Sequence, residues 1–155
     1  MAKIDAKLHL NAQEIDALMG TVVHLRMATI GPGTRINLTP MTFGWAGGKI
    51  YIFGRGQKIA NLRRDTTATM LIDVGEAWRE LQGIMMQGQA EILETAAEEA
   101  EDGDLPAAQL NIGQKHSLTK DGANAPYQAT AAGNSRRWIV FTPTQMVSWD
   151  NQKLA

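Results

Sequence analysis

The segment KIYIFGRGQKIANLRRDTTATMLIDV, residues 49–74, decides the fold. It opens and closes with runs of β-branched and aromatic side chains that are typical of strands, residues 49–53 and 66–74. Between these runs lie two glycines and a stretch whose apolar residues recur at helical spacing, with the cationic residues on the other side. The sequence therefore predicts a strand, a short helix that begins between residues 55 and 60, and a second strand.

Further strands flank this segment on both sides. HLRMATI (24–30) ends in a Gly-Pro-Gly turn, and RINLTPMTFGW (35–45) follows it. Such short turns predict an antiparallel meander, because parallel neighbours need long crossovers. Downstream, residues 80–93 have the pattern of a long strand, and residues 136–143 and 144–150 indicate two final strands with a proline between them. Six or seven antiparallel strands with short helices predict a mainly β fold, a closed or partly closed barrel.

Two helices and a long irregular segment complete the predicted single domain of 155 residues. Residues 10–20 have the spacing of an amphipathic helix with Asn11 at its N-cap, and a second helix begins near Thr95. Pro40 indicates an edge position or a bulge, since proline donates no ladder hydrogen bond. Residues 103–134 contain four glycines and few apolar side chains, which predicts a long loop and not a core helix.

Composition and charge exclude several classes of protein. Hydrophobic residues make up 44% and charged residues 20%, which is ordinary globular usage. A net charge of −1 gives no whole-chain argument for binding nucleic acid or an anionic membrane, and no apolar run is long enough to cross a bilayer. The absence of cysteine excludes a disulfide framework and a thiolate metal site, and it fits a cytoplasmic protein. The three histidines are far apart in the sequence, so we expect no metal site.

Residues 54–58, Gly-Arg-Gly-Gln-Lys, have the features of a phosphate-binding turn. The glycines let the backbone approach a ligand closely. Arg55 offers a planar fork of donors and Lys58 a point charge, and a helix N-terminus follows directly. The pattern therefore predicts a phosphate cradle; the alternative interpretation is a solvated basic helix.

The same segment resembles the central motif of the pyridoxamine 5′-phosphate oxidase-like family of flavin-binding split β-barrels. In that family a strand, a polar turn and a lysine precede a short helix ending Asn-Leu-Arg-x-Asp, and a later long strand ends Gly-x-Ala-Glu. This chain matches at Lys58, residues 61–65 and residues 88–91. Residues 25–45 resemble the family's first hairpin, and residues 147–154 resemble its terminal Ser-Trp-Asp-x-x-Lys-Leu.

The resemblance implies an FMN-binding homodimer with its cofactor sites at the subunit interface. Lys58 would hold the flavin phosphate, with Arg55 and Gln57 beside it, while the strand around residues 37–42 would line the isoalloxazine ring. Trp149 matches a C-terminal aromatic residue that approaches the cofactor; the alternative is a core or interface tryptophan. The implied cofactor-binding residues are Asn37, Thr39, Pro40, Met41, Thr42, Arg55, Gln57, Lys58, Gln82 and Trp149.

The chain also departs from the true oxidase. Residues 150–155 lack the arginines and histidine that bind the substrate phosphate, and Gln57 stands where an arginine usually precedes the phosphate lysine. We therefore expect an FMN-dependent oxidoreductase of the same family that acts on another small organic substrate, with no evident catalytic side chain. The alternatives are a deazaflavin-dependent reductase, a non-catalytic flavin- or haem-binding protein, and a structural dimer with an empty groove.

The predicted loop 103–134 is placed to act as a lid over the flavin ring. His116 and Tyr127 are its best candidates for substrate contact, because each has a ring together with a titratable or hydrogen-bonding group. The alternative is a mobile surface loop without a role.

Overall fold

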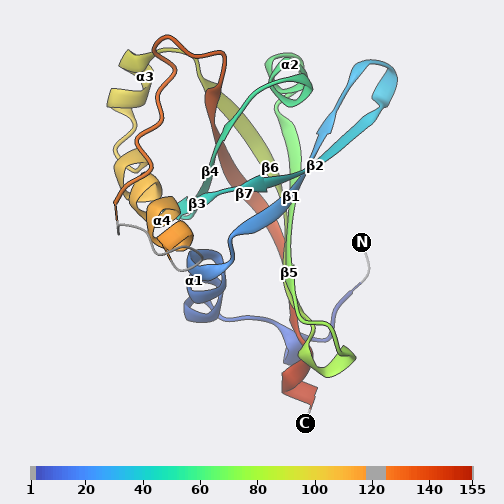
Figure 1. Cartoon of the computed structure of the whole chain (residues 1–155). Helices are drawn as coiled ribbons and strands as arrows, with labels where there is room; N and C mark the ends of the chain where they lie inside the picture. The colour runs from blue at the N-terminus through green and yellow to red at the C-terminus, as the bar shows by residue number, and fades with distance from the viewer. Residues whose placement is uncertain (1–2, 118–124, 155) are drawn as a thin grey trace.

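The computed structural model describes residues 3–117 and 125–154 and contains one seven-stranded antiparallel sheet (Figure 1). The strands follow the order β2-β1-β5-β6-β7-β4-β3, and the sheet curls into a half-barrel. This confirms the predicted fold class. The strands are β1 His24–Ile30, β2 Ile36–Thr42, β3 Gly44–Ala46, β4 Lys49–Gly54, β5 Thr67–Val74, β6 Gln82–Leu93 and β7 Arg137–Asp150.

The expected breaks between strands are partly wrong. The region predicted as one strand, residues 35–45, is divided into β2 and β3, which pair with different neighbours. Conversely, the two predicted final strands form the single strand β7. The pairing of β6 with β7 shifts register between Gln87 and Gly88, next to Pro143. The bulge leaves Thr144 without a ladder partner beside the proline, which cannot donate a hydrogen bond, so the strand bends and continues.

Local signals place the first three α-helices correctly. Helix α1 begins with a capping box, in which the Asn11 side chain accepts from the Glu14 N–H at 2.9 Å. Helix α2 begins inside the predicted window, and the Thr95 side chain caps α3. The helices are α1 Ala12–Thr21, α2 Gln57–Arg64, α3 Ala96–Glu101 and α4 Leu105–Ser117, with 3-10 turns η1 Ala6–Leu8, η2 Pro32–Thr34, η3 Trp78–Glu80 and η4 Asn151–Leu154. No helix in the described part of the chain is long and apolar enough to span a membrane.

Helix α4 contradicts the prediction of a long loop over 103–134. Leu105, Ala108 and Ile112 are buried against strands β4 and β7, where they join a second hydrophobic cluster. Their spacing puts them on one helix face, and burial of that face offsets the low propensity of Gly113 inside the helix. Residues 118–124 of the predicted loop lie outside the described residues.

The remainder of the predicted loop, residues 125–134, runs with residues 135–136 beside α3 and α4 to the start of β7 (Figure 1). It is fixed by hydrogen bonds to buried groups. The buried Glu99 carboxylate accepts from the Thr130 hydroxyl at 2.7 Å and from the Ala131 N–H at 2.6 Å. The Trp138 indole N–H donates to the Ala129 carbonyl at 2.8 Å. We call residues 125–136 the strap.

Strand β4 and residues 138–141 of β7 are buried on both faces. Ile50 and Ile52 point into the half-barrel with the main hydrophobic cluster, while Tyr51 and Phe53 point to the other side and pack with α4. This alternation follows the two-residue period of a strand. The pair of strands therefore separates the barrel core from the layer formed by α4 and the strap.

Candidate cofactor site

The N-terminus of α2 is open and closely approached by two side chains. Gly56 precedes the helix with φ +85°, a conformation that favours glycine, and no side chain of the described residues caps the helix start. At Gly54, a Cβ atom would lie 3.3 Å from Lys58 Cδ and 3.4 Å from Met41 Cε. The small residue therefore allows the lysine stem and the β2 side chain to meet at the helix N-terminus.

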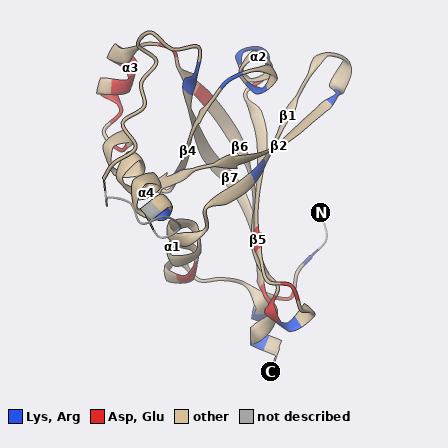
Figure 2. Cartoon of the chain, in the orientation of Figure 1, with Lys and Arg blue, Asp and Glu red and all other residues tan. Residues whose placement is uncertain are grey.

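Positive charges converge at this point without an acid. Burial, then the charges of Arg136 and Arg55, lower the pKa of the half-buried Lys58, and Figure 2 shows Lys and Arg positions in blue along α2. Within the described residues, none of these three cations forms an ion pair, whereas Arg63 of the same helix pairs with Glu94 at 2.6 Å. Among the described residues, Lys58 Nζ donates a hydrogen bond to the Arg55 carbonyl alone, at 2.8 Å. An uncompensated cluster at a helix N-terminus is a site suited to an anion.

A hollow of about 460 Å³ lies between α2 and the tip of the β1–β2 hairpin. It adds Arg35, which sequence reasoning missed, to the predicted residues Asn37 and Gln57. The sequence gives little reason to predict a binding role for Arg35, because single arginines are common after turns at protein surfaces. Buried Asn61 fixes the geometry: it accepts from Gln57 Nε2 at 2.8 Å and donates to the Thr29 hydroxyl at 3.0 Å.

A second hollow, of about 420 Å³, joins the predicted ring wall to the predicted substrate contacts. It lies between the end of β2, β4, α4 and the strap, and we call it the strap pocket. The Phe53 ring meets the Tyr127 ring edge to face, with centroids 6.4 Å apart. Of the predicted ring wall, Thr39 is absent from this lining; its buried hydroxyl has no hydrogen-bond partner among the described residues. The lining residues are Pro40, Met41, Thr42, Phe53, Ile112, His116, Tyr127 and Arg136.

Gln82 and Trp149 lie at the other end of the sheet. Gln82 pairs with Val74 and Asp150, whereas the residue of β6 that is nearest the end of α2 in the ladder is Gln89, paired with Thr67. At about 3.3 Å per residue, these two positions on β6 are roughly 23 Å apart. The Trp149 indole packs on Gly83 at the same far end. Along the ladder, a single chain therefore separates Gln82 and Trp149 from α2 and its predicted phosphate-binding residues.

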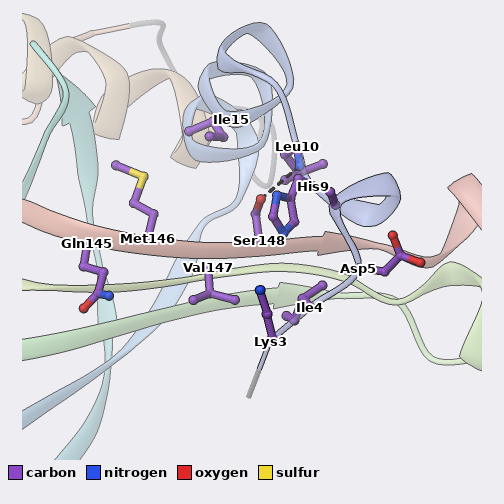
Figure 3. A pocket seen from close by; sticks show the side chains of 11 residues that line it. Lys3, Ile4, Asp5, His9, Leu10, Ile15, Gln145, Met146, Val147 and Ser148 are labelled. Carbon is purple, nitrogen blue, oxygen red and sulfur yellow. Dashed lines mark hydrogen bonds between the residues drawn. The ribbon is translucent and has the colours of Figure 1, made fainter. Parts of the chain in front are cut away.

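Another hollow, of about 880 Å³, lies between the N-terminal segment and β7 and contains none of the predicted cofactor residues (Figure 3). Its lining is mixed: Lys3, Asp5 and His9 stand among apolar side chains, and the Leu10 N–H donates to the Ser148 hydroxyl at 2.9 Å. No comparable gathering of one charge occurs there. Within residues 3–117 and 125–154, no group of three acidic or histidine side chains is arranged to hold a metal ion.

The sequence model of the family described as pyridoxamine 5′-phosphate oxidase matches residues 12–150, so this chain belongs to that family. No curated protein sequence matches the chain.

Solved structures share the fold. The conserved hypothetical protein Rv2991 from Mycobacterium tuberculosis is 26% identical, with a TM-score of 0.79, over 99% of this chain and 92% of the other. A FAD-binding protein from Mesorhizobium loti is 16% identical, with a TM-score of 0.65, over 90% and 94%. An F420 reductase is 18% identical, with a TM-score of 0.56, over 85% and 94%.

Proposed function

We propose that this protein binds flavin mononucleotide at the N-terminus of α2 and uses it as an oxidoreductase on a small organic substrate. The observation that carries the proposal is the meeting of Arg55 and Lys58 at an uncapped helix start, with no acid paired to either of them among the described residues. A phosphate group compensates these charges and accepts hydrogen bonds from the free N–H groups. Membership of the family supports the same assignment.

Each part of the site has a distinct task in this proposal. Lys58 and Arg55 hold the phosphate, with Gln57 and Arg35 at the wall of the adjoining hollow. The backbone and side chains of residues 37–42 orient the flavin ring along β2. Pro40 suits this role, because a strand edge that faces a ring need not donate every ladder hydrogen bond. The flavin, when bound, supplies the hydride or electron transfer, and the protein supplies binding and orientation.

A second copy of the chain completes the proposal. The outer face of the sheet carries exposed apolar side chains: Ile36 is 67% and Leu38 63% exposed on β2, although they alternate with less exposed polar residues. The register continues this face through Arg26, which pairs with Asp73, to half-buried Leu71, Met85 and Val147. Apolar surface of this kind marks an interface. A homodimer across it also offers a way for Gln82 and Trp149 of one subunit to reach the cofactor held by its partner.

The test compares FMN with riboflavin, which lacks the phosphate. Binding to the purified protein is followed through quenching of flavin fluorescence. A charge-assisted hydrogen bond is worth roughly 1.5–3 kcal/mol, so FMN should bind about ten- to a hundredfold more tightly than riboflavin. Equal affinities for the two flavins would contradict the phosphate cradle.

A deazaflavin is the second candidate cofactor, because an F420 reductase shares the fold and covers 85% of this chain. Competition distinguishes the two assignments: coenzyme F420 added to the FMN-loaded protein releases FMN only if both occupy the same groove. Preferential binding of F420 would replace FMN in the proposal. The visible spectrum separates a third candidate, since a haem-binding protein gives a Soret band.

A further inference from the structure

We propose that the strap pocket is the substrate subsite and that it selects a planar, apolar molecule bearing a carboxylate, which Arg136 recognises. This inference deepens the proposed function and rests on it. The pocket adjoins the predicted ring wall through Met41 and Thr42, so a molecule bound there lies beside the flavin.

The walls of the pocket fit a flat, apolar body. Phe53 and Tyr127 meet edge to face, and Ile112 and Met41 add aliphatic surface. Aromatic rings favour offset or edge-to-face packing against other planar groups. The volume of about 420 Å³ is that of a site for a small molecule and not for a polymer.

The strap holds this wall in place before a ligand arrives. The Tyr127 N–H donates to the Gln109 carbonyl of α4 at 2.9 Å, and the Tyr127 ring also packs against Trp138, with centroids 6.2 Å apart. The buried Glu99 carboxylate secures the next turn of the strap. A site fixed in this way loses little conformational entropy when a ligand binds.

Arg136 gives the pocket its charge preference. Its guanidinium is half-buried and forms no ion pair within the described residues, whereas the neighbouring Arg137 lies 3.8 Å from the Glu94 carboxylate. A guanidinium fork matches both oxygens of a carboxylate. His116 and Tyr127 are titratable side chains in the same lining, and Lys58 lies near enough to interact with the charge of Arg136.

The experiment uses benzoate and benzamide as probes, which have the same ring and nearly the same size but differ in charge. Each is titrated into the FMN-loaded protein by calorimetry. We expect benzoate to bind about ten-fold or more tightly than benzamide. Arg136→Gln should abolish this preference, and Arg79→Gln, at an exposed arginine of η3, should preserve it. Tyr127→Leu should weaken both probes equally, because it removes the ring wall and leaves the charge.

Three outcomes would overturn the inference: equal binding of the two probes, a preference unchanged in Arg136→Gln, or weaker binding of FMN but not riboflavin in that variant. The last result would assign Arg136 to the phosphate cradle and leave the proposed function standing. If the protein binds no flavin, the proposed function fails, and the same titration into the flavin-free protein still decides the subsite through the benzoate preference.

Discussion

At the scale of single residues, Lys58 is the centre of the cofactor proposal. Replacing Lys58 with Met keeps the aliphatic stem that packs near Gly54 and removes the charge. We expect FMN affinity to fall about ten- to a hundredfold, since a charge-assisted bond is lost. Riboflavin affinity, measured by the same fluorescence quenching, should change little.

Lys7→Met, at an exposed lysine in η1, is the matched control and should leave both affinities unchanged. Equal weakening of both flavins in Lys58→Met would show that the lysine acts through the fold and not through the phosphate.

Lys115 is a second residue whose charge has consequences. It is 1% exposed, its ammonium lies 3.5 Å from the centroid of the Phe43 ring, and it donates to the Phe43 carbonyl at 3.0 Å. Burial lowers the pKa of Lys115 to about 7. Lys115→Met removes the cost of burying a charge while keeping a side chain of similar shape.

The sign of the pH dependence follows from these values. The pKa of this lysine is 10.5 in the unfolded chain and about 7 in the folded protein, so between these values the unfolded state binds more protons. The stability contribution of Lys115 is complete above pH 10.5 and falls as the pH decreases toward 7. From pH 7 to pH 9 the wild type should therefore gain about 2 kcal/mol in free energy of unfolding relative to Lys115→Met.

Urea unfolding of both proteins at the two pH values measures this difference, and comparison of the variants cancels the other titrating groups. If the free energy of unfolding changes equally in the two proteins between pH 7 and pH 9, then the lysine is fully charged at pH 7 in the folded protein, or its side chain reaches solvent.

At the scale of elements, the strap depends on one buried carboxylate. Glu99→Ala leaves the Thr130 hydroxyl and the Ala131 N–H without their acceptor, which costs about 1–3 kcal/mol. We expect lower stability in urea and faster amide exchange in the strap. Glu101→Ala, at an exposed position of the same helix, is the control. Unchanged exchange at Ala131 in Glu99→Ala would show that other contacts hold the strap.

The elements also show what a sequence can and cannot predict. Helix α2 and its flanking strands follow from local signals, because turn glycines, helical spacing and β-branched runs act over a few residues. Helix α4 does not, since burial against β4 and β7 decides it and that contact joins distant parts of the chain. The continuity of β7 also depends on a contact between distant parts of the chain. Pro143 alone predicts a break between two strands, whereas pairing with β6 on both sides of the bulge keeps β7 continuous.

The residues of the candidate site also differ in whether local sequence signals can predict them. The turn of residues 54–58 is contiguous, so Arg55 and Lys58 could be predicted from it. The register of the β1–β2 hairpin places Arg35, and the path of the strap places Arg136. Neither of these features can be predicted from a short sequence pattern.

At the scale of the whole molecule, the apolar outer face predicts association. Leu38→Asp places a charge in the proposed interface, at a side chain that is 63% exposed in one chain. We expect the wild type to sediment at twice the mass of one chain and the variant at one, because an unpaired charge is costly to bury. FMN affinity should fall with the dimer, since Gln82 and Trp149 would no longer be supplied by a partner.

Leu110→Asp is the matched control, because Leu110 is 42% exposed on α4, away from this face. It should sediment like the wild type. A wild-type protein that sediments at the mass of one chain at micromolar concentration would contradict the homodimer.

The burial of β4 and of residues 138–141 of β7 on both faces also affects how small molecules enter and leave. Opening the molecule on the side of α4 would expose Tyr51, Trp138 and the helix residues packed on them, so it approaches the cost of global unfolding. Within the described part of a single chain, the hairpin of β1 and β2, whose tip carries exposed side chains, has no such attachment on its outer edge. We expect the route of exchange to run past that hairpin, so a bulky label at its tip should slow flavin release more than a label on α4.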